Sequence, residues 1–272
     1  SSLTTMFWDG RVSHNIKNGV FKTPDQGLNG EYPLYWKITS KIENVMAMQA
    51  LFPIASVTEM RGDKFKKLSN FQVWEIVSKR VLSSQFYEED LKNYNKDDFN
   101  IADIANALAY YQKVEFQVND TPLDKYIKGD LNKLSLREKK GAKLYFEKAR
   151  CARCHRGELL SNKVFQSIGV PQIGPGVTQD KNDEGRFLIN GNENSKYGFF
   201  TQPLRNVAIT APYFHNGAFK NLMEVVEHYN NPSRSLHNFD INLLQKRFGR
   251  SYDDFIYVDR NQYNNFYRIQ SL

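Results

Sequence analysis

Apolar residues recur at spacings of three and four along much of the chain, which is the pattern of a helix with one buried face. Ile101, Ala105 and Leu108 begin one such series, and it continues to Tyr111. Residues 70–94 carry a second series, which predicts one or two further helices. Its apolar members are Phe71, Trp74, Val77, Val81 and Leu82.

Polar residues mark where two more helices begin. Thr121 precedes Pro122, and Asp124 follows, which is the order of an N-cap, a first-turn proline and a first-turn acid. Ser135 and Glu138 have the spacing of a capping box. The helix that this box opens runs toward a pair of cysteines, and its apolar side is formed by Leu136, Leu144, Tyr145 and Ala149.

Glycine, proline and asparagine gather in two long segments, residues 10–38 and 169–198. Turn formers at this density predict loops, and the apolar residues 187–189 inside the second segment indicate that it is ordered. Because helix signals dominate elsewhere, the sequence predicts an all-α fold of two domains with long ordered loops. The division is expected near Val118–Pro122, between two helices.

Composition bounds the class of protein. The 272 residues are enough for one large or two small domains, and 40% hydrophobic with 25% charged residues is typical of a globular protein. No run approaches the ~18 apolar residues of a membrane span. The first residues, S-S-L-T-T-M, lack the basic and apolar regions of a signal peptide, so we expect either a removed signal or a start further upstream.

The net charge of +7 says little about the function of the chain as a whole. No recognised nucleic-acid module accompanies it, but basic residues gather around the cysteines. They are Lys139, Lys140, Lys143, Lys148, Arg150, Arg153 and Arg156. Such a group is either an ordinary solvated helix face or a basic rim around a site, and a basic rim would steer an acidic partner.

The chain has two cysteines, Cys151 and Cys154, in the sequence C-A-R-C-H that ends at His155. C-x-x-C-H is the attachment motif of c-type haem. Two thiols form thioethers with the porphyrin vinyl groups, and the next histidine binds the iron. Because haem c is normally attached outside the cytoplasm, the motif predicts a periplasmic or otherwise extracytoplasmic protein.

Two other kinds of site use closely spaced cysteines. Structural zinc needs about four ligands, and the chain has no second cysteine pair. A thioredoxin-like redox pair would lie in a βαβ unit, and no such pattern surrounds these cysteines. Both interpretations are weaker than haem attachment.

A predicted helix over residues 221–229 offers Met223, His228 and Tyr229 as a second axial ligand of the iron. The residues with the spacing of one inward face are Leu222, Val225, Val226 and Tyr229. Tyr229 is therefore expected toward the core and His228 toward water. On periodicity alone an ordinary core tyrosine is the simpler interpretation. A tyrosinate ligand would stabilise ferric iron, whereas methionine would raise the reduction potential.

Longer motifs follow one another along the chain. They are F-W-D-G-R at 7–11, Q-A-L-F-P-I-A-S-V-T-E-M at 49–60, D-E-G-R-F at 183–187 and L-R-N-V-A-I-T-A-P-Y-F-H-N-G-A-F at 204–219, followed by E-V-V-E-H-Y. Together with the segment from Thr121 to His155, they resemble the bacterial dihaem cytochrome c peroxidases and their MauG-like relatives. The resemblance covers most of residues 40–230 and implies cytochrome c-like haem domains.

The resemblance implies that the C-x-x-C-H motif holds the C-terminal, electron-transfer haem c. Tyr229 stands where the peroxidases have an axial methionine and where MauG has an axial tyrosine. Trp8 matches the tryptophan that relays electrons between the two haems. Arg205 and His215 match positions near the haem interface, where we expect structural or propionate-binding roles.

Other matching residues belong to the peroxide site on the N-terminal haem. Gln49, Pro53 and Glu59 match residues that line this site, and Glu59 would be the acid/base that moves a proton across peroxide. Thr210 and Pro212 match positions that offer backbone carbonyls to a calcium ion between the domains, which suits a hard cation.

The chain departs from the family in two ways. The family has two C-x-x-C-H motifs and this chain has one, so the first haem is expected on missing N-terminal residues or on a separate polypeptide. The stretch 12–47 is longer than its counterpart in short peroxidases, and we interpret it as an insertion. The expected domains are a partial peroxidatic domain at 1–119, a haem domain at 120–240, and an aromatic tail at 241–272 that packs on the first domain.

The resemblance implies an oxidoreductase that uses hydrogen peroxide at one haem and moves electrons through a second. Tyr229 favours a MauG-like enzyme that oxidises a partner protein, because an axial tyrosine makes a poor high-potential entry site for electrons. One alternative is a cytochrome c peroxidase supplied by a small cytochrome or cupredoxin. Another is a monohaem electron-transfer subunit of a larger assembly that does no chemistry itself.

Overall fold

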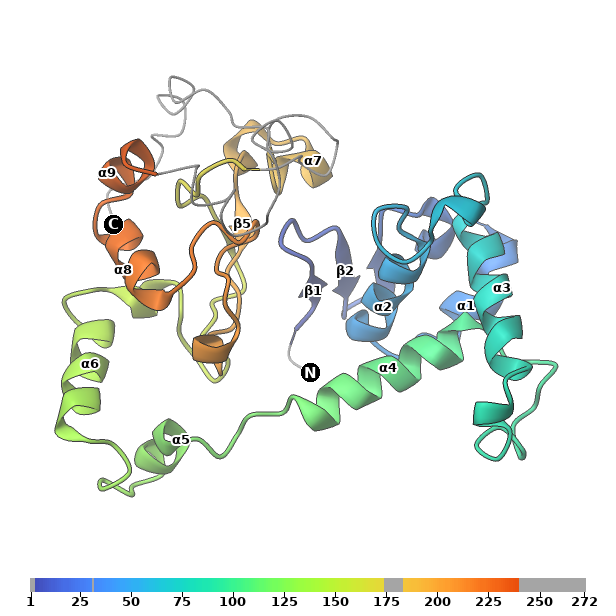
Figure 1. Cartoon of the computed structure of the whole chain (residues 1–272), viewed down its shortest axis with the longest axis horizontal. Helices are drawn as coiled ribbons and strands as arrows, with labels where there is room; N and C mark the ends of the chain where they lie inside the picture. The colour runs from blue at the N-terminus through green and yellow to red at the C-terminus, as the bar shows by residue number, and fades with distance from the viewer. Residues whose placement is uncertain (1–2, 31, 174–182, 240–272) are drawn as a thin grey trace. The chain divides into compact units, whose positions relative to one another are not determined.

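The computed structural model describes residues 3–30, 32–173 and 183–239 (Figure 1). The chain divides into two compact units. The first contains the chain up to Phe7 and from Arg11 to Gln117, and the second contains Trp8–Gly10 and the chain from Val118 onward. The predicted aromatic tail at 241–272 lies outside the described residues.

The first unit combines a small antiparallel sheet with helices. The sheet has the order β1-β2-β3, formed by β1 (Thr5–Met6), β2 (Val12–Asn15) and β3 (Val20–Lys22). The α-helices are α1 (Trp36–Thr39), α2 (Val45–Ala55), α3 (Asn70–Leu82) and α4 (Ile101–Glu115). Single 3-10 turns lie at Gln26–Asn29, Pro33–Tyr35, Asp63–Phe65 and Gln85–Tyr87.

The helices of this unit begin at polar caps. Ser69 and Gln72 form a capping box at the start of α3, and Asn100 and Asp103 form another at the start of α4. The Asn44 side chain accepts hydrogen bonds from two backbone N–H groups at the start of α2. The structure thus confirms the helices predicted within residues 70–94 and from residue 101.

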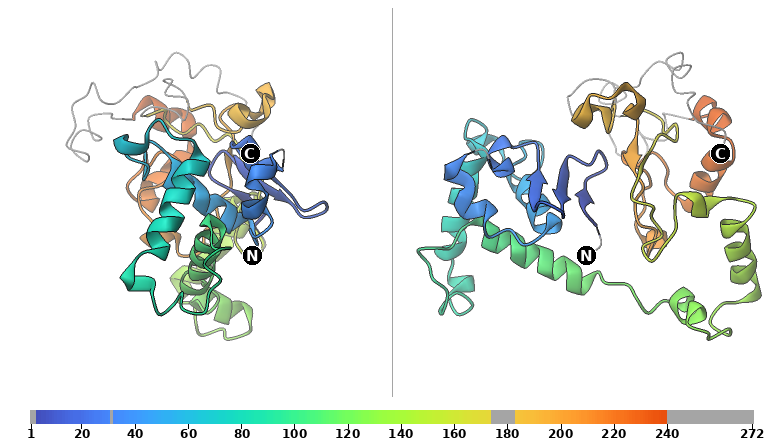
Figure 2. Two further views of the ribbon diagram at one scale, coloured as in Figure 1. Left: turned by 90° about the vertical axis from the view of Figure 1, so that its right-hand side faces the viewer. Right: turned by 180° about the vertical axis from the view of Figure 1, so that it is seen from behind.

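The prediction for the buried face of α4 is partly wrong. Leu108 and Tyr111 are 41% and 56% exposed, and the face that packs inward is made of Ile101, Ala102, Ala105 and Ala109. Helices α2, α3 and α4 pack against one another in every view (Figures 1 and 2). Small alanines suit close helix approach, so packing rather than hydropathy alone selects the buried side.

Trp74 is the largest fully buried side chain of this core. Its indole Nε1–H donates to the Leu51 carbonyl oxygen at 3.0 Å.

Helix α2 contains a proline, Pro53. Because Pro53 has no N–H, it cannot donate the usual helical hydrogen bond to the carbonyl of Gln49, four residues earlier.

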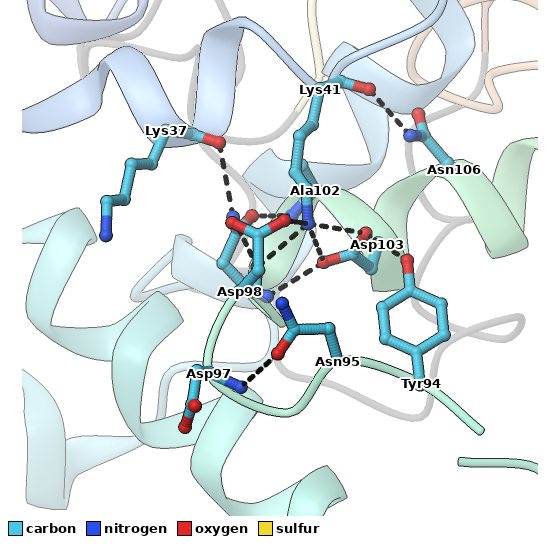
Figure 3. Close-up of polar contacts among 10 residues, drawn as sticks. Lys37, Lys41, Tyr94, Asn95, Asp97, Asp98, Ala102, Asp103 and Asn106 are labelled. Carbon is cyan, nitrogen blue, oxygen red and sulfur yellow. Dashed lines mark hydrogen bonds and ion pairs between the residues drawn. The ribbon is translucent and has the colours of Figure 1, made fainter. Parts of the chain in front are cut away.

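The loop before α4 is tied to the segment after α1 by an ionic network (Figure 3). Lys41 Nζ lies 2.9 Å from a carboxylate oxygen of Asp98 and 3.0 Å from one of Asp103. The Tyr94 hydroxyl donates to Asp103 at 2.6 Å, and the Asn100 N–H donates to it at 2.8 Å. Burial alone would raise the pKa of Asp103, but these hydrogen bonds outweigh it and hold the pKa below its usual value.

The second unit contains short helices and long ordered segments. Its α-helices are α5 (Pro122–Ile127), α6 (Leu136–Phe146), α7 (Phe187–Asn190), α8 (Leu222–Asn230) and α9 (Pro232–His237). The strands β4 (Phe165–Gln166) and β5 (Phe199–Phe200) pair antiparallel. Single 3-10 turns lie at Cys151–Arg153, Glu193–Ser195 and Val207–Ile209.

Both capping predictions in this unit are confirmed. Asp124 accepts from the Thr121 N–H at 2.9 Å at the start of α5, and Glu138 accepts from the Ser135 N–H at 2.7 Å at the start of α6. The apolar side expected for α6 is not buried against protein, however, since Leu136 is 78% exposed.

The structure is mostly helical, but the all-α prediction omits two small sheets. Residues 16–19 form the turn between β2 and β3, and Gly19 at its end adopts a positive φ of 70°. Asn-Gly is a strong hairpin signal, which a count of turn formers treats only as loop. None of the helices in the described part of the chain combines the length and hydropathy that a bilayer crossing demands.

Asp103→Asn tests the ionic network. The substitution leaves Lys41 with a weaker partner and removes a charged acceptor from Tyr94. We expect a loss of about 1–3 kcal/mol in unfolding free energy at neutral pH, measured by urea denaturation with tryptophan fluorescence. Asp97→Asn changes an exposed carboxylate nearby and is the control. Equal denaturation midpoints for the two variants would contradict this prediction.

Candidate functional site

The C-x-x-C-H residues form one tight backbone turn after α6. Arg150 enters it with a positive φ of 56°. The backbone N–H groups of Cys154 and His155 then both donate to the Cys151 carbonyl, at 3.2 and 2.9 Å. This turn brings two thiols and an imidazole together, and all three side chains are only half-buried.

His155 is held as the tautomer that can bind a metal. Its Nδ1 lies 3.2 Å from the Leu160 carbonyl oxygen, which can only accept, so Nδ1 carries the proton and Nε2 keeps its lone pair. The Tyr145 hydroxyl donates to the His155 carbonyl at 2.5 Å. Burial lowers the pKa of His155, although the nearby carbonyls of Leu160 and Gln202 oppose this shift. The imidazole is therefore neutral at physiological pH.

Tyr229 comes from α8, and both cysteines are among its electrostatic neighbours. Burial raises the pKa of Tyr229, and Cys154, Cys151 and Tyr145 raise it further. Solvent still reaches 39% of its surface. Two thiols, a histidine lone pair and a phenol are a donor set that fits haem c.

Helix α8 also presents an apolar side that protein does not cover. Met223 and Val226 precede Tyr229 at intervals of three and are 67% and 61% exposed. An exposed apolar side next to a haem attachment motif fits a large apolar cofactor. In the described residues, no group of three or more His, Cys, Asp and Glu side chains could hold a metal ion, so the zinc interpretation has no support there.

The predicted orientation of α8 is wrong for His228. This side chain is fully buried rather than exposed, and its ring lies 5.4 Å from that of Phe214 and 5.2 Å from that of Phe219. Leu222, Val225 and His228 recur every three residues, so the spacing could have revealed this face. A hydropathy pattern misses this face because hydropathy scales count histidine as polar.

Trp8 belongs to the second unit together with Asp9 and Gly10. The Phe200 N–H donates to the Trp8 carbonyl at 2.7 Å, and Arg186 Nη1 donates to the Asp9 and Gly10 carbonyls at 3.2 and 2.9 Å. Gly10 has a positive φ of 71°, and a Cβ there would lie 2.3 Å from the Phe165 ring. The F-W-D-G-R motif thus requires its glycine for this close approach.

His215 is a buried histidine without a hydrogen-bond partner on either ring nitrogen in the described part of the chain. Its ring stacks on Phe199 with centroids 3.6 Å apart, and the Trp8 ring meets it at 6.4 Å. Asp183 lies 3.9 Å from Nε2. Burial lowers the pKa of His215 to about 3, so the ring is neutral and its polar atoms can take a further partner.

Two roles are predicted for Arg205, a structural one and propionate binding, and its contacts favour the structural role. Its guanidinium donates to both Asp124 carboxylate oxygens, at 2.9 and 2.7 Å. It also donates to the carbonyls of Glu158 and Val118, at 2.7 and 3.0 Å. Arg205 and Thr121 hold the pKa of Asp124 well below its usual value. The ion pair joins α5 to the chain just after the C-x-x-C-H turn.

The predicted peroxide residues all lie in the first unit. Gln49 and Pro53 are four residues apart and half-buried on one side of α2. The Met60 N–H donates to the Pro53 carbonyl at 3.2 Å, so the turn that carries Glu59 lies against the end of α2. Glu59 itself is exposed.

The predicted calcium residues Thr210 and Pro212 are exposed in the second unit. The Thr210 hydroxyl donates to the Val207 carbonyl at 3.1 Å. A site made of backbone carbonyls stays a prediction.

Comparison with known proteins tests this resemblance. The family described as di-haem cytochrome c peroxidase matches residues 1–132. Cytochrome c551 peroxidase of Nitrosomonas europaea is 32% identical over 219 residues, which are 79% of this chain and 60% of that protein. These matches confirm the resemblance that the motifs predict: over most of its length the chain is similar to the dihaem cytochrome c peroxidases and MauG.

Two further members of this family are also similar. Cytochrome c551 peroxidase of Pseudomonas aeruginosa is 36% identical over 107 residues, or 39% of this chain and 31% of that protein. Methylamine utilization protein MauG of Methylophilus methylotrophus is 26% identical over 207 residues, or 73% of this chain and 57% of that protein. The chain therefore spans from 31% to 60% of the length of these three relatives.

Asp124→Asn tests the ion pair behind the haem-binding turn. We expect a loss of about 1.5–3 kcal/mol in unfolding free energy at pH 7, because a charged hydrogen-bonded pair is broken. Because the folded-state pKa of Asp124 is lowered, its contribution is present above the unfolded pKa of about 4 and is lost as the pH falls through the folded-state value.

Wild type should therefore lose its advantage over the variant on acidification, as measured by denaturation at pH 7, 4 and 2.5. Asp120→Asn, in an exposed ion pair with Lys125, is the matched control and should cost little. A constant difference between wild type and Asp124→Asn across this pH range would argue against the ion pair.

Proposed function

We propose that this chain forms part of an extracytoplasmic dihaem c oxidoreductase that uses hydrogen peroxide in the manner of MauG and oxidises a partner protein or other donor. The observation that carries the proposal is the C-x-x-C-H turn, which brings two thiols and the His155 imidazole together and has both cysteines among the electrostatic neighbours of Tyr229. Similarity to the dihaem peroxidases and MauG supports the haem and peroxide chemistry, and the tyrosine favours the MauG-like type.

At this site the chain supplies every group that a haem c requires. Cys151 and Cys154 would form the thioethers, and the His155 Nε2 lone pair would bind the iron. A bound haem supplies an iron that changes its oxidation state. Tyr229 has to lose its phenolic proton to become the second ligand, and its raised pKa opposes this. The deprotonated form of Tyr229 would be favoured beside a bound iron, because the charge of a metal dominates the local electrostatics.

Other residues would serve electron transfer and peroxide. The Trp8 indole, against the His215 ring, is the proposed electron relay, and His215 offers a neutral ring to a propionate. In the first unit, the Glu59 carboxylate would take a proton from one peroxide oxygen and return it to the other, with Gln49 and Pro53 lining the site. The family is described as di-haem, and both cysteines of this sequence lie in one motif. A second haem c would need a second C-x-x-C-H motif, which these 272 residues do not contain.

The charge around the motif supports a protein partner with an acidic surface. Residues 136–158 contain eight Lys and Arg against three Glu, and most of these basic side chains are exposed. A concentrated positive field of this kind accelerates encounter with an acidic surface. Calcium held by the carbonyls of Thr210 and Pro212 is a further part of the proposal.

A second candidate is a cytochrome c peroxidase that takes electrons from a small cytochrome or a cupredoxin. The printed names of the Pseudomonas and Nitrosomonas relatives favour it. A third is an electron-transfer subunit with one haem and no chemistry of its own, which the single C-x-x-C-H motif allows.

Hydrogen peroxide added to the haem-loaded protein separates these candidates. The MauG-like type predicts a long-lived change in the haem spectrum of the ferric protein without any electron donor. The peroxidase predicts rapid peroxide consumption only with a reduced small cytochrome or cupredoxin. A haem stain with iron analysis accompanies the test, since one iron per chain and no reaction with peroxide would refute both enzymes.

Tyr229→Phe tests the second axial ligand. Removing the phenolic oxygen leaves no oxygen donor on that residue. We therefore expect the ferric iron to change its spin state, as seen in the absorption and electron paramagnetic resonance spectra. Tyr110→Phe removes a hydroxyl from an exposed tyrosine of the first unit and is the matched control. Identical spectra for wild type and Tyr229→Phe would exclude tyrosine ligation and bring Met223 forward.

A further inference from the structure

His228 precedes Tyr229 in α8 and is held in an unusually complete way for a histidine. None of its surface reaches solvent. Its ring packs with those of Phe214 and Phe219, which come from the segment just before α8, and the three ring centroids lie 5.2–5.4 Å apart. Burying a polar ring in such apolar surroundings costs free energy, and hydrogen bonds to its nitrogens offset that cost.

Both ring nitrogens of His228 have a hydrogen-bond partner, and one tautomer of the ring is compatible with both hydrogen bonds. Nε2 lies 2.8 Å from the Ile168 carbonyl oxygen, which only accepts, so Nε2 carries the proton. Nδ1 lies 3.1 Å from the Ser235 hydroxyl of α9, which can donate to the free lone pair. His228 thereby joins α8 to α9 and to a chain segment sixty residues earlier.

These contacts fix which side of α8 faces inward. Hydropathy alone favours a rotation that buries Val226 and Tyr229 and leaves His228 in water. In the structure Val226 is 61% exposed and Tyr229 is 39% exposed, while His228 is fully buried. In the rotation that satisfies His228, the Tyr229 ring lies 5.9 Å from that of Phe214 and stays partly exposed, and Cys151 and Cys154 are among its electrostatic neighbours.

We propose that His228 is a positioning residue: its hydrogen bonds to Ile168 and Ser235 set the rotation of α8 and so hold Tyr229 toward the C-x-x-C-H turn. The inference deepens the proposed function and rests on it where Tyr229 is taken as the iron ligand. The placement of Tyr229 by His228 is a separate matter and can be measured separately.

The test uses variants of the haem-loaded protein that remove the hydrogen bonds step by step. His228→Leu keeps much of the volume and removes both bonds, whereas His228→Gln keeps an amide N–H that can reach the Ile168 carbonyl. Ser235→Ala removes only the partner of Nδ1 and is the mild variant if His228→Leu does not fold. His237→Leu alters an exposed histidine of α9 and is the control.

The first readout is the ferric spectrum compared with that of Tyr229→Phe. Each lost hydrogen bond should shift the balance between the two rotations of α8 by about tenfold. His228→Leu is then expected to give a spectrum like that of Tyr229→Phe, and His228→Gln to restore most of the wild-type spectrum. A lower thermal midpoint with an unchanged spectrum would show a merely structural role and overturn the proposal.

The second readout does not depend on iron ligation. Nitration of Tyr229 by tetranitromethane, measured by peptide mass spectrometry relative to exposed Tyr110, reports the surroundings of the phenol. If Tyr229→Phe leaves the spectrum unchanged, the ligand assignment fails. A changed Tyr229 nitration rate in His228→Leu, restored in His228→Gln, would then still support the positioning role. An unchanged rate in that case would overturn it.

Discussion

The hydrogen bond between His155 Nδ1 and the Leu160 carbonyl is the interaction on which the ligand chemistry of the C-x-x-C-H turn depends. It is a contact between residues only five apart, yet it decides which ring nitrogen keeps a lone pair. Without it the histidine could carry its proton on either nitrogen, and the C-x-x-C-H turn would supply two thiols and an undirected imidazole. The 151–155 turn sets the position of the His155 imidazole. The Leu160 carbonyl sets which of its two nitrogens is left free to bind a metal.

The rest of the second unit holds that short turn in place from several sides. Arg205 reaches the chain after the turn through Glu158 and anchors it to Asp124 of α5, while Tyr145 of α6 holds the His155 carbonyl. These contacts are strong because each involves a charge or a half-buried hydroxyl with little competing water. The α6 helix itself is not buried against protein in the described residues. The turn therefore depends on discrete polar contacts more than on a hydrophobic core.

The sequence predicts best those features that are set by neighbours along the chain. The N-cap at Thr121, the capping box at Ser135 and the C-x-x-C-H spacing need only a few adjacent residues, and both caps form as expected. Features set by distant partners are predicted poorly. The buried side of α4 is made of alanines because α2 lies close, and the side of α8 that faces inward is set by Ile168, sixty residues away from His228. Periodicity predicts that a helix has a buried and an exposed side. Which residues lie on the buried side depends on the segments that pack against the helix.

The error at α8 shows why a ligand helix departs from simple hydropathy. A helix that must leave a phenol and apolar residues accessible for a cofactor cannot use its most apolar side for packing. It needs another means of attachment, and a buried histidine with two hydrogen bonds provides one, because it gives direction as well as contact. The uncovered side, with Met223, Val226 and Tyr229, then looks like poor packing in the protein alone. Such a side is what a helix beside a large apolar cofactor is expected to show.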